Sequence, residues 1–190
     1  MTTESFGPSA ILTPANGVTL ARIFFAPAAF ALMIADRDRS SWLLVSVWFV
    51  LSFSDMLDGR LARKYGSTRS GAFLDPLADK ILVLGGVGSM CLGAKFTWGW
   101  FALALIVFRE VAISIYRATY VKHGLAIPAS KMAKWKTFVQ LAAVGWVTWP
   151  WTTDFRWLSD ATLWVGVGLG LVSGVQYLVA GSRAATTMAR

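Results

Sequence analysis

The chain has 190 residues, 56% of them hydrophobic, with ten tryptophans and a formal net charge of +8. Its mean hydropathy of +0.57 excludes an ordinary soluble domain, because a chain of this length folds in water with much less apolar surface. The charge does not indicate nucleic-acid binding, since the basic residues fall in particular loops and form no basic stripe interleaved with aromatic residues.

Six apolar runs predict an all-α integral membrane protein with six transmembrane helices. Pro27 lies inside the first run and indicates a kink that a membrane helix tolerates. An even number of spans places both termini on the same side of the membrane. The predicted runs are 16–35, 41–54 (continuing into the motif described below), 73–92, 98–120, 135–150 and 158–180.

The loop charges predict the orientation of these spans. Lysines and arginines concentrate in the connections around 60–71 and 117–136, which positive-inside statistics assign to the cytoplasm. The short segment 1–15 should also be cytoplasmic, and it does not read as a cleaved signal peptide because it has no basic region. The opposite connections hold only Arg37, Arg39, Lys95 and Arg156.

Four aspartates lie close together between apolar runs. Asp55 and Asp58 are spaced i,i+3, and Asp75 and Asp79 are spaced i,i+4, so on helices each pair would share one face. Four carboxylates gathered by two facing helices would repel one another, and burying them near a bilayer is costly. Divalent cations among them would remove this cost, because ions such as Mg²⁺ prefer carboxylate oxygen.

The alternative is a set of unrelated charges at a helix–loop–helix junction. In that interpretation Asp58 and Gly59 form a turn, and Asp79 pairs with Lys80 or Arg63. It leaves the regular spacing of the small and basic residues around the aspartates without an explanation.

The two halves of this stretch read Asp-x2-Asp-Gly-x2-Ala-Arg over 55–63 and Gly-x3-Asp-x3-Asp over 71–79. Together they resemble the signature of the CDP-alcohol phosphotransferases, integral membrane enzymes of phospholipid synthesis. That family usually has one residue more between the two halves than the seven found here, 64–70. The resemblance implies that residues 1–190 form a single transmembrane catalytic domain in a bacterial cytoplasmic membrane, a helical bundle whose active site faces the cytoplasm.

The same resemblance implies a chemistry for the aspartates. The reaction attacks the β-phosphorus of a CDP-linked lipid and releases CMP. Two divalent cations, Mg²⁺ or Mn²⁺, would be held by Asp55, Asp58, Asp75 and Asp79. Asp79 would also act as the general base that accepts a proton from the attacking hydroxyl.

A polar element opens the first apolar run. Asn16, Thr19 and Arg22 are spaced three residues apart, which places them on roughly one helical face. This element resembles the opening of the same family, where it lies beside the nucleotide site. Alternatively, Asn16 caps the helix and Arg22 snorkels to the interface. The expected CDP-lipid contacts are Asn16, Thr19, Gly59, Ala62, Arg63 and Gly71.

A second charged group follows in the fourth and fifth runs. Arg109 and Glu110 lie deep in an apolar run, where charges are costly, and Arg117 follows on about the same face. Lys134 and Lys136 then enter the fifth run. Plain positive-inside anchoring is one explanation of these lysines. The group also resembles the branch of the family whose acceptor is glycerol 3-phosphate, which implies that Arg109, Arg117, Lys134 and Lys136 bind the acceptor phosphate.

The predicted function is phosphatidyl transfer from CDP-diacylglycerol to glycerol 3-phosphate in a lipid membrane. Within the family, other acceptors stay open: phosphatidylglycerol, inositol phosphate or serine. A divalent-cation transporter is the alternative from another class, although a cation path gains nothing from Arg63. Glycines in 166–174 would allow close helix packing, either within the chain or in a homodimer.

Overall fold

The computed structural model describes residues 13–35, 41–65, 69–122, 131–152 and 154–188, and for part of these, including 55–65, only the course of the backbone. Within these ranges the fold is all-helical. The elements are α1 Pro14–Ala35, α2 Trp42–Tyr65, α3 Arg69–Leu92, α4 Gly99–Lys122, α5 Lys131–Thr148, the 3-10 turn η1 Pro150–Thr152 and α6 Arg156–Met188.

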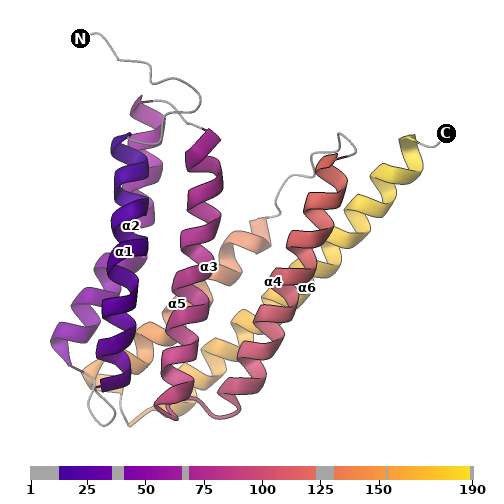
Figure 1. Ribbon diagram of the computed structural model, residues 1–190. Coiled ribbons are helices and arrows are strands. Elements are labelled where there is room, and N and C mark those ends of the chain that lie inside the picture. The colour runs from indigo at the N-terminus through magenta and orange to yellow at the C-terminus, as the bar shows by residue number, and fades with distance from the viewer. Residues whose placement is uncertain (1–12, 36–40, 66–68, 123–130, 153, 189–190) are drawn as a thin grey trace.

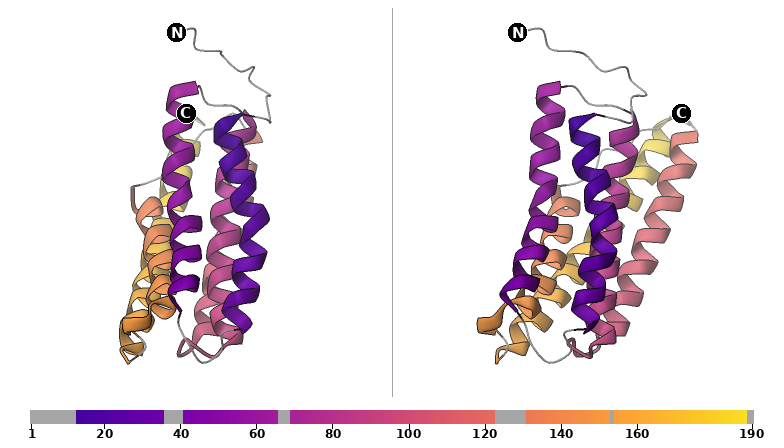
Figure 2. Two further views of the ribbon diagram at one scale, coloured as in Figure 1. Left: turned by 90° about the vertical axis from the view of Figure 1, so that its left-hand side faces the viewer. Right: turned by 60° about the vertical axis from the view of Figure 1, so that its left-hand side comes forward.

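The helices run up and down in a bundle with α3 near its middle (Figure 1). α1 packs against both α2 and α3, and α5 packs along α6. α3 also contacts α4 and α5, so it joins the two halves of the bundle. Figures 1 and 2 show that α1 and α3 begin, and α2 ends, at the same end of the bundle. The polar segments 16–22, 55–63 and 71–79 therefore lie at one end, although they are distant in sequence.

The helix starts follow from local capping chemistry. Thr13 precedes α1 and its hydroxyl accepts the backbone N–H of Asn16 at 3.2 Å, with Pro14 at the first helical position. Ser41 caps α2 in the same way, accepting the N–H of Leu44 at 3.1 Å. The alternative that Asn16 is the cap of the first helix is therefore wrong, because Thr13 has that role.

The interior of the bundle is packed tightly around an indole. Trp48 of α2 is 2% exposed, and its Nε1 donates a hydrogen bond to the carbonyl of Leu141 in α5 at 3.1 Å. Gly86 of α3 faces the same ring, and a Cβ atom there would lie 2.6 Å from Trp48. Glycine at this position lets α3 approach α2 closely.

Gly166 and Gly174 of α6 face other helices of the same chain. A Cβ atom at Gly166 would lie 2.8 Å from Gln140 of α5, and one at Gly174 would lie 3.6 Å from Arg109 of α4. These contacts support the packing interpretation of the glycine-rich segment. A homodimer stays a prediction.

Within the part of the chain that the structure describes, three helical segments are long and apolar enough to cross a membrane: Pro14–Ala35, Gly99–Thr119 and Arg156–Ser182. Large aromatic side chains on the outside of the bundle, such as Phe24 at 77% exposed and Phe108 at 70%, suit contact with lipid. The chain thus has helices of the kind that an integral membrane protein requires. The remaining three predicted spans stay a prediction.

Candidate active site

The first polar cluster joins the beginning of α1 to α3. Thr19 is fully buried, and its hydroxyl lies 3.0 Å from Asp75 Oδ1 and 3.3 Å from the carbonyl of Ala15. One helical turn earlier, the side-chain amide of Asn16 donates to Ser70 Oγ at 3.3 Å. The Asn16 and Thr19 side chains therefore both point across to α3, as their common spacing predicts.

Arg22 continues this face of α1 and connects three helices. Arg22 is 2% exposed, and its Nε donates a hydrogen bond to Ser54 Oγ of α2 at 2.9 Å. Its Nη1 lies 3.6 Å from Asp79 Oδ1 of α3. The interpretation that Arg22 snorkels toward the interface is wrong, because the guanidinium is directed into the bundle.

Asp75 and Asp79 lie one turn apart on α3, and both face α1. Asp75 contacts Thr19, and Asp79 pairs with Arg22. The alternative in which Asp79 pairs with Lys80 is not what the structure shows, because the Lys80 ammonium lies with groups of α4 instead. Two of the four aspartates thus share a helical face, as their i,i+4 spacing predicts.

The other motif residues lie on the last turns of α2. The helix runs without interruption to Tyr65, so the alternative in which Asp58 and Gly59 form a turn is wrong. Among the residues whose side chains are described, no group of three or more His, Cys, Asp or Glu could hold a metal ion. That search does not reach the first aspartate pair. For Asp55, Asp58, Gly59, Ala62 and Arg63 the structure describes only the course of the backbone.

Gly71 opens the second half of the motif in the first turn of α3. It is buried and lies one residue after Ser70, the partner of Asn16. The absence of a side chain at this position keeps the backbone accessible to a close neighbour, either helix or ligand. Gly71 therefore belongs to the same end of the bundle as Asn16 and Thr19.

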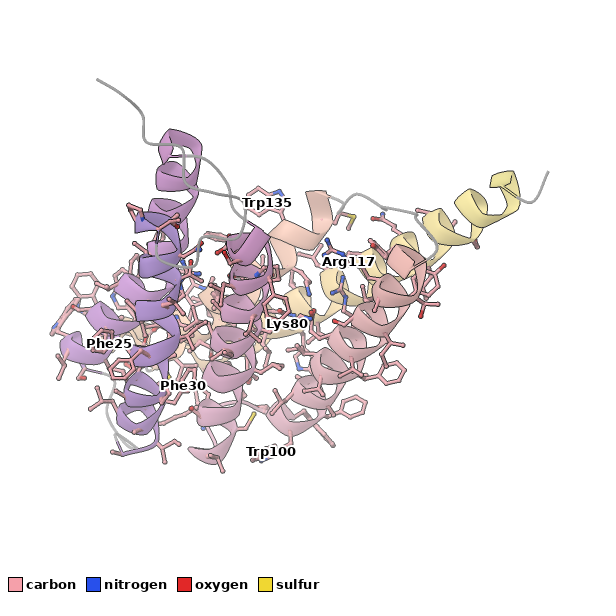
Figure 3. The ribbon with its side chains drawn as sticks, turned by 45° about the horizontal axis from the view of Figure 1, so that its top comes forward. Phe25, Phe30, Lys80, Trp100, Arg117 and Trp135 are labelled. Atoms are coloured by element: carbon pink, nitrogen blue, oxygen red, sulfur yellow. The ribbon has the colours of Figure 1, made fainter. Side chains whose placement is uncertain are left out.

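A second polar cluster, which we call the cationic cluster, consists of Lys80, Arg109, Glu110 and Lys136. Glu110 Oε1 accepts a hydrogen bond from Arg109 Nη1 at 2.8 Å and another from Lys136 Nζ. Lys80 Nζ lies 4.0 Å from Glu110 Oε2 and donates to Ser114 Oγ at 2.6 Å. Figure 3 shows Lys80 on the side of α3 that faces α4. The cluster therefore brings together side chains from α3, α4 and α5.

The four predicted phosphate-binding residues are placed differently from one another. Arg109 and Lys136 lie in the cationic cluster, and Arg109 is also tied to α6 through the carbonyl of Gly170 at 3.1 Å and Ser173 Oγ at 3.0 Å. Arg117 is exposed two turns further along α4 (Figure 3), and it makes no hydrogen bond or ion pair to another described residue. Lys134 is in the first turn of α5, but its side chain lies outside the described residues.

Lys80 is the functional candidate that the sequence reasoning missed. It directly follows Asp79, and consecutive residues of a helix point about 100° apart, so Lys80 faces a different neighbour. The signal was a charged residue one position outside the matched motif, inside an apolar run. Only the packing of α4 against α3 shows that Lys80 lies with the arginine and lysine of the second group.

The arrangement places opposite charges on two faces of one helix. On the α1 side, α3 presents Asp75 and Asp79, and on the α4 side it presents Lys80 to the cationic cluster. Carboxylate oxygens suit hard divalent cations or a proton transfer, whereas clustered lysine and arginine suit phosphate. Both kinds of group are therefore available on α3 and the helices packed against it.

Comparison with known proteins agrees with this chemistry. Residues 12–172 match the model of the family described as CDP-alcohol phosphatidyltransferase. A Mycobacterium tuberculosis protein named probable phosphatidylglycerophosphate synthase is 32% identical over 178 residues, which cover 90% of this chain and 83% of that protein. Two proteins named CDP-diacylglycerol--glycerol-3-phosphate 3-phosphatidyltransferase are also similar. The one from Escherichia coli is 31% identical, covering 86% of this chain and 91% of its own, and the one from Haemophilus influenzae is 29% identical, covering 85% and 89%.

Proposed function

Because the chain belongs to the CDP-alcohol phosphatidyltransferase family, we propose that it transfers the phosphatidyl group of CDP-diacylglycerol to glycerol 3-phosphate. The products are phosphatidylglycerophosphate and CMP. The observation that carries this choice of acceptor is the position of Lys80, which connects the cationic cluster to the helix of Asp75 and Asp79. The names of the relatives from Mycobacterium tuberculosis, Escherichia coli and Haemophilus influenzae point to the same acceptor.

Two divalent cations, Mg²⁺ or Mn²⁺, fit the residues of the acidic end. Asp75 and Asp79 present carboxylate oxygens on one face of α3, and the Thr19 hydroxyl at 3.0 Å holds the Asp75 carboxylate in place. Asp55 and Asp58 would complete the set from α2. When bound, the cations would neutralise the diphosphate of the substrate and the charge that develops on the departing CMP.

The nucleotide part of CDP-diacylglycerol would lie at the same end of α1, α2 and α3. Arg63 suits the diphosphate, since a guanidinium recognises phosphate with two parallel hydrogen bonds. Small residues in this region would allow the nucleotide to lie against the backbone. The proposed contacts are Asn16, Thr19, Gly59, Ala62, Arg63 and Gly71.

The acceptor would approach from the other face of α3. Its phosphate would be bound by Arg109, Arg117, Lys134 and Lys136, and its primary hydroxyl would be directed at Asp79. Asp79 accepts the hydroxyl proton while the oxygen forms a bond to the β-phosphorus. The bond from that phosphorus to the oxygen bridging the two phosphates breaks, and CMP leaves with the bonding electrons.

The proposal includes a topology. Residues 1–190 would form one transmembrane catalytic domain with six spans in the cytoplasmic membrane of a bacterium, and segment 1–15 and the active site would face the cytoplasm. The chain would act as a homodimer in contact with membrane lipid. Membrane-impermeant labelling of single cysteines, introduced near 37 and near 117 in a protein whose Cys91 is replaced by alanine, tests the orientation. The cysteine near 37 should react from the outside only.

An acceptor panel with purified protein and radiolabelled CDP-diacylglycerol tests the function. We expect a labelled lipid product and an equal amount of CMP with glycerol 3-phosphate, and no lipid product with phosphatidylglycerol, inositol phosphate or serine. A product with one of those acceptors instead would move the chain to another branch of the family. If no acceptor releases CMP while the protein carries Mg²⁺ across liposome membranes, the transporter alternative is correct.

A further inference from the structure

Glu110 is the carboxylate at the centre of the cationic cluster. Its Oε1 accepts hydrogen bonds from Arg109 and Lys136, and its Oε2 lies 4.0 Å from Lys80 Nζ. Its side chain is 14% exposed, and those of Arg109 and Lys136 are 10% and 9% exposed. The three cations come from three different helices, so the Glu110 carboxylate connects charged side chains of α3, α4 and α5.

The balance of charge suits a particular ligand. Three cations and one carboxylate leave a formal charge of +2 in the cluster (three minus one). A phosphate monoester carries roughly −1.5 to −2 near pH 7, whereas a phosphate diester carries a single negative charge and a polyol carries none. Without Glu110 the cations would repel one another and be costly to bury.

The three cations depend on Glu110 to different degrees. Arg109 is held independently by the carbonyl of Gly170 and by Ser173 of α6. Lys80 has a second partner in Ser114. Within the part of the chain that the structure describes, Glu110 is the only residue to which the Lys136 ammonium donates a hydrogen bond. Removing the carboxylate should therefore release Lys136 first.

We propose that Glu110 is a positioning residue that gathers Lys80, Arg109 and Lys136 into one anion site for a phosphate monoester. Glu110 itself acts through the lysines and the arginine and touches neither reacting atom. This inference rests on the proposed function, because it takes the phosphorylated acceptor as the ligand of the cluster. It assigns the arrangement of the three cations in the acceptor site to one carboxylate.

The test is the full-length protein with Glu110→Gln, assayed by initial rates of CMP release while each substrate is varied. Losing a hydrogen bond between charged groups should raise the KM for glycerol 3-phosphate by ~10-fold or more. The KM for CDP-diacylglycerol should change by less than about twofold, since the cluster faces the acceptor. Glu110→Asp keeps the charge and should recover part of the loss, which a purely steric role would not predict.

The double variant Glu110→Gln with Lys136→Gln measures whether Glu110 acts through Lys136. We expect its acceptor KM to lie close to that of Lys136→Gln alone, because the two substitutions remove the same interaction. Removing both partners leaves no unpaired lysine, so this variant also tests the proposal if Glu110→Gln does not fold. Asp160→Asn is the matched control, a carboxylate on α6 that accepts the N–H of Thr97 at 2.9 Å and should leave both KM values unchanged.

Fully additive effects, or an equal rise in the KM of both substrates, would overturn the proposal. It would also be overturned if the wild type used only an uncharged acceptor. If the wild type uses another phosphate monoester in place of glycerol 3-phosphate, the proposed function fails. In that case, comparing the KM for that acceptor between the wild type and the Glu110 variants still tests the role of Glu110.

Discussion

Thr19→Val removes one hydroxyl from the acidic end and leaves the shape of the side chain almost unchanged. Thr19 is fully buried, and its hydroxyl lies 3.0 Å from Asp75 Oδ1. The hydroxyl has only one proton to donate. A hydrogen bond to the charged carboxylate of Asp75 is stronger than one to the neutral carbonyl of Ala15, which lies 3.3 Å away. Valine leaves that oxygen of Asp75 without this donor.

The expected change in Mg²⁺ affinity can be worked out from the hydrogen bond between Thr19 and Asp75 alone. A hydrogen bond to a charged group contributes about 1.5 to 3 kcal/mol, which corresponds to roughly a 10- to 150-fold change in an equilibrium constant. Groups that orient a metal ligand typically change metal affinity by roughly 10- to 100-fold when they are removed. We therefore expect Thr19→Val to raise the Mg²⁺ concentration needed for half-maximal CMP release by roughly 10- to 100-fold.

Two measurements check this expectation. The first is CMP release at saturating substrates over a range of Mg²⁺ concentrations. The second is the rise in Tm that Mg²⁺ causes in the absence of substrate, since an ion that binds only the folded protein stabilises it. The Mg²⁺-dependent rise should shift to higher concentration in Thr19→Val, and Thr19→Ser, which keeps the hydroxyl, should behave more like the wild type.

Thr148→Val is the matched control. Thr148 is also fully buried, and its hydroxyl donates to the Gly145 carbonyl at 2.9 Å near the end of α5 away from the acidic cluster. Its substitution should lower the Tm without changing the Mg²⁺ dependence. The reasoning is refuted if Thr19→Val and Thr148→Val shift the Mg²⁺ dependence equally, or if neither shifts it.

Three further variants probe the remaining parts of the structure. Asp79→Asn should abolish CMP release, because an amide accepts no proton, while binding of CDP-diacylglycerol to the purified protein is largely retained; substantial turnover would contradict the role of Asp79 as base. Lys136→Ala should raise the KM for glycerol 3-phosphate much more than that for CDP-diacylglycerol, and the reverse pattern in initial-rate kinetics would assign the lysine to the lipid substrate. Gly86→Ala should lower the free energy of unfolding by about 1 to 3 kcal/mol, because the added Cβ would lie 2.6 Å from Trp48. Gly168→Ala should not lower it, because a Cβ there would have nothing within 4 Å. Equal stability of the two variants in thermal unfolding would contradict the packing argument.

Several elements could be predicted from the sequence because they depend on local spacing. The i,i+4 separation of Asp75 and Asp79 predicts a shared helical face, and both side chains do face α1. The ends of the helices were less predictable. α3 begins at Arg69 rather than 73, and α6 continues to Met188 rather than 180, because hydropathy marks the thickness of the bilayer and not the end of a helix.

The partners of the charged groups could not be predicted, because they depend on which helices pack together. Arg22 lies 57 positions before Asp79 (79 minus 22), and only the packing of α1 on α3 brings them to 3.6 Å. The contact of Lys80 with Ser114 depends in the same way on α4. A charged residue inside an apolar run indicates that a partner is required, but its spacing to other residues does not identify that partner.

The two faces of α3 restrict the shape of the acceptor. Asp79 and Lys80 are consecutive, so their Cα atoms are about 3.8 Å apart, while their side chains turn toward α1 and α4. If Asp79 accepts the proton of the attacking hydroxyl and Lys80 belongs to the phosphate site, both groups of the acceptor must reach across a single helix. A three-carbon chain with a hydroxyl at one end and a phosphate monoester at the other meets this requirement, and a bulky diester lipid meets it poorly. The position of the two groups on adjacent residues of α3 therefore argues for glycerol 3-phosphate separately from the charge of the cluster.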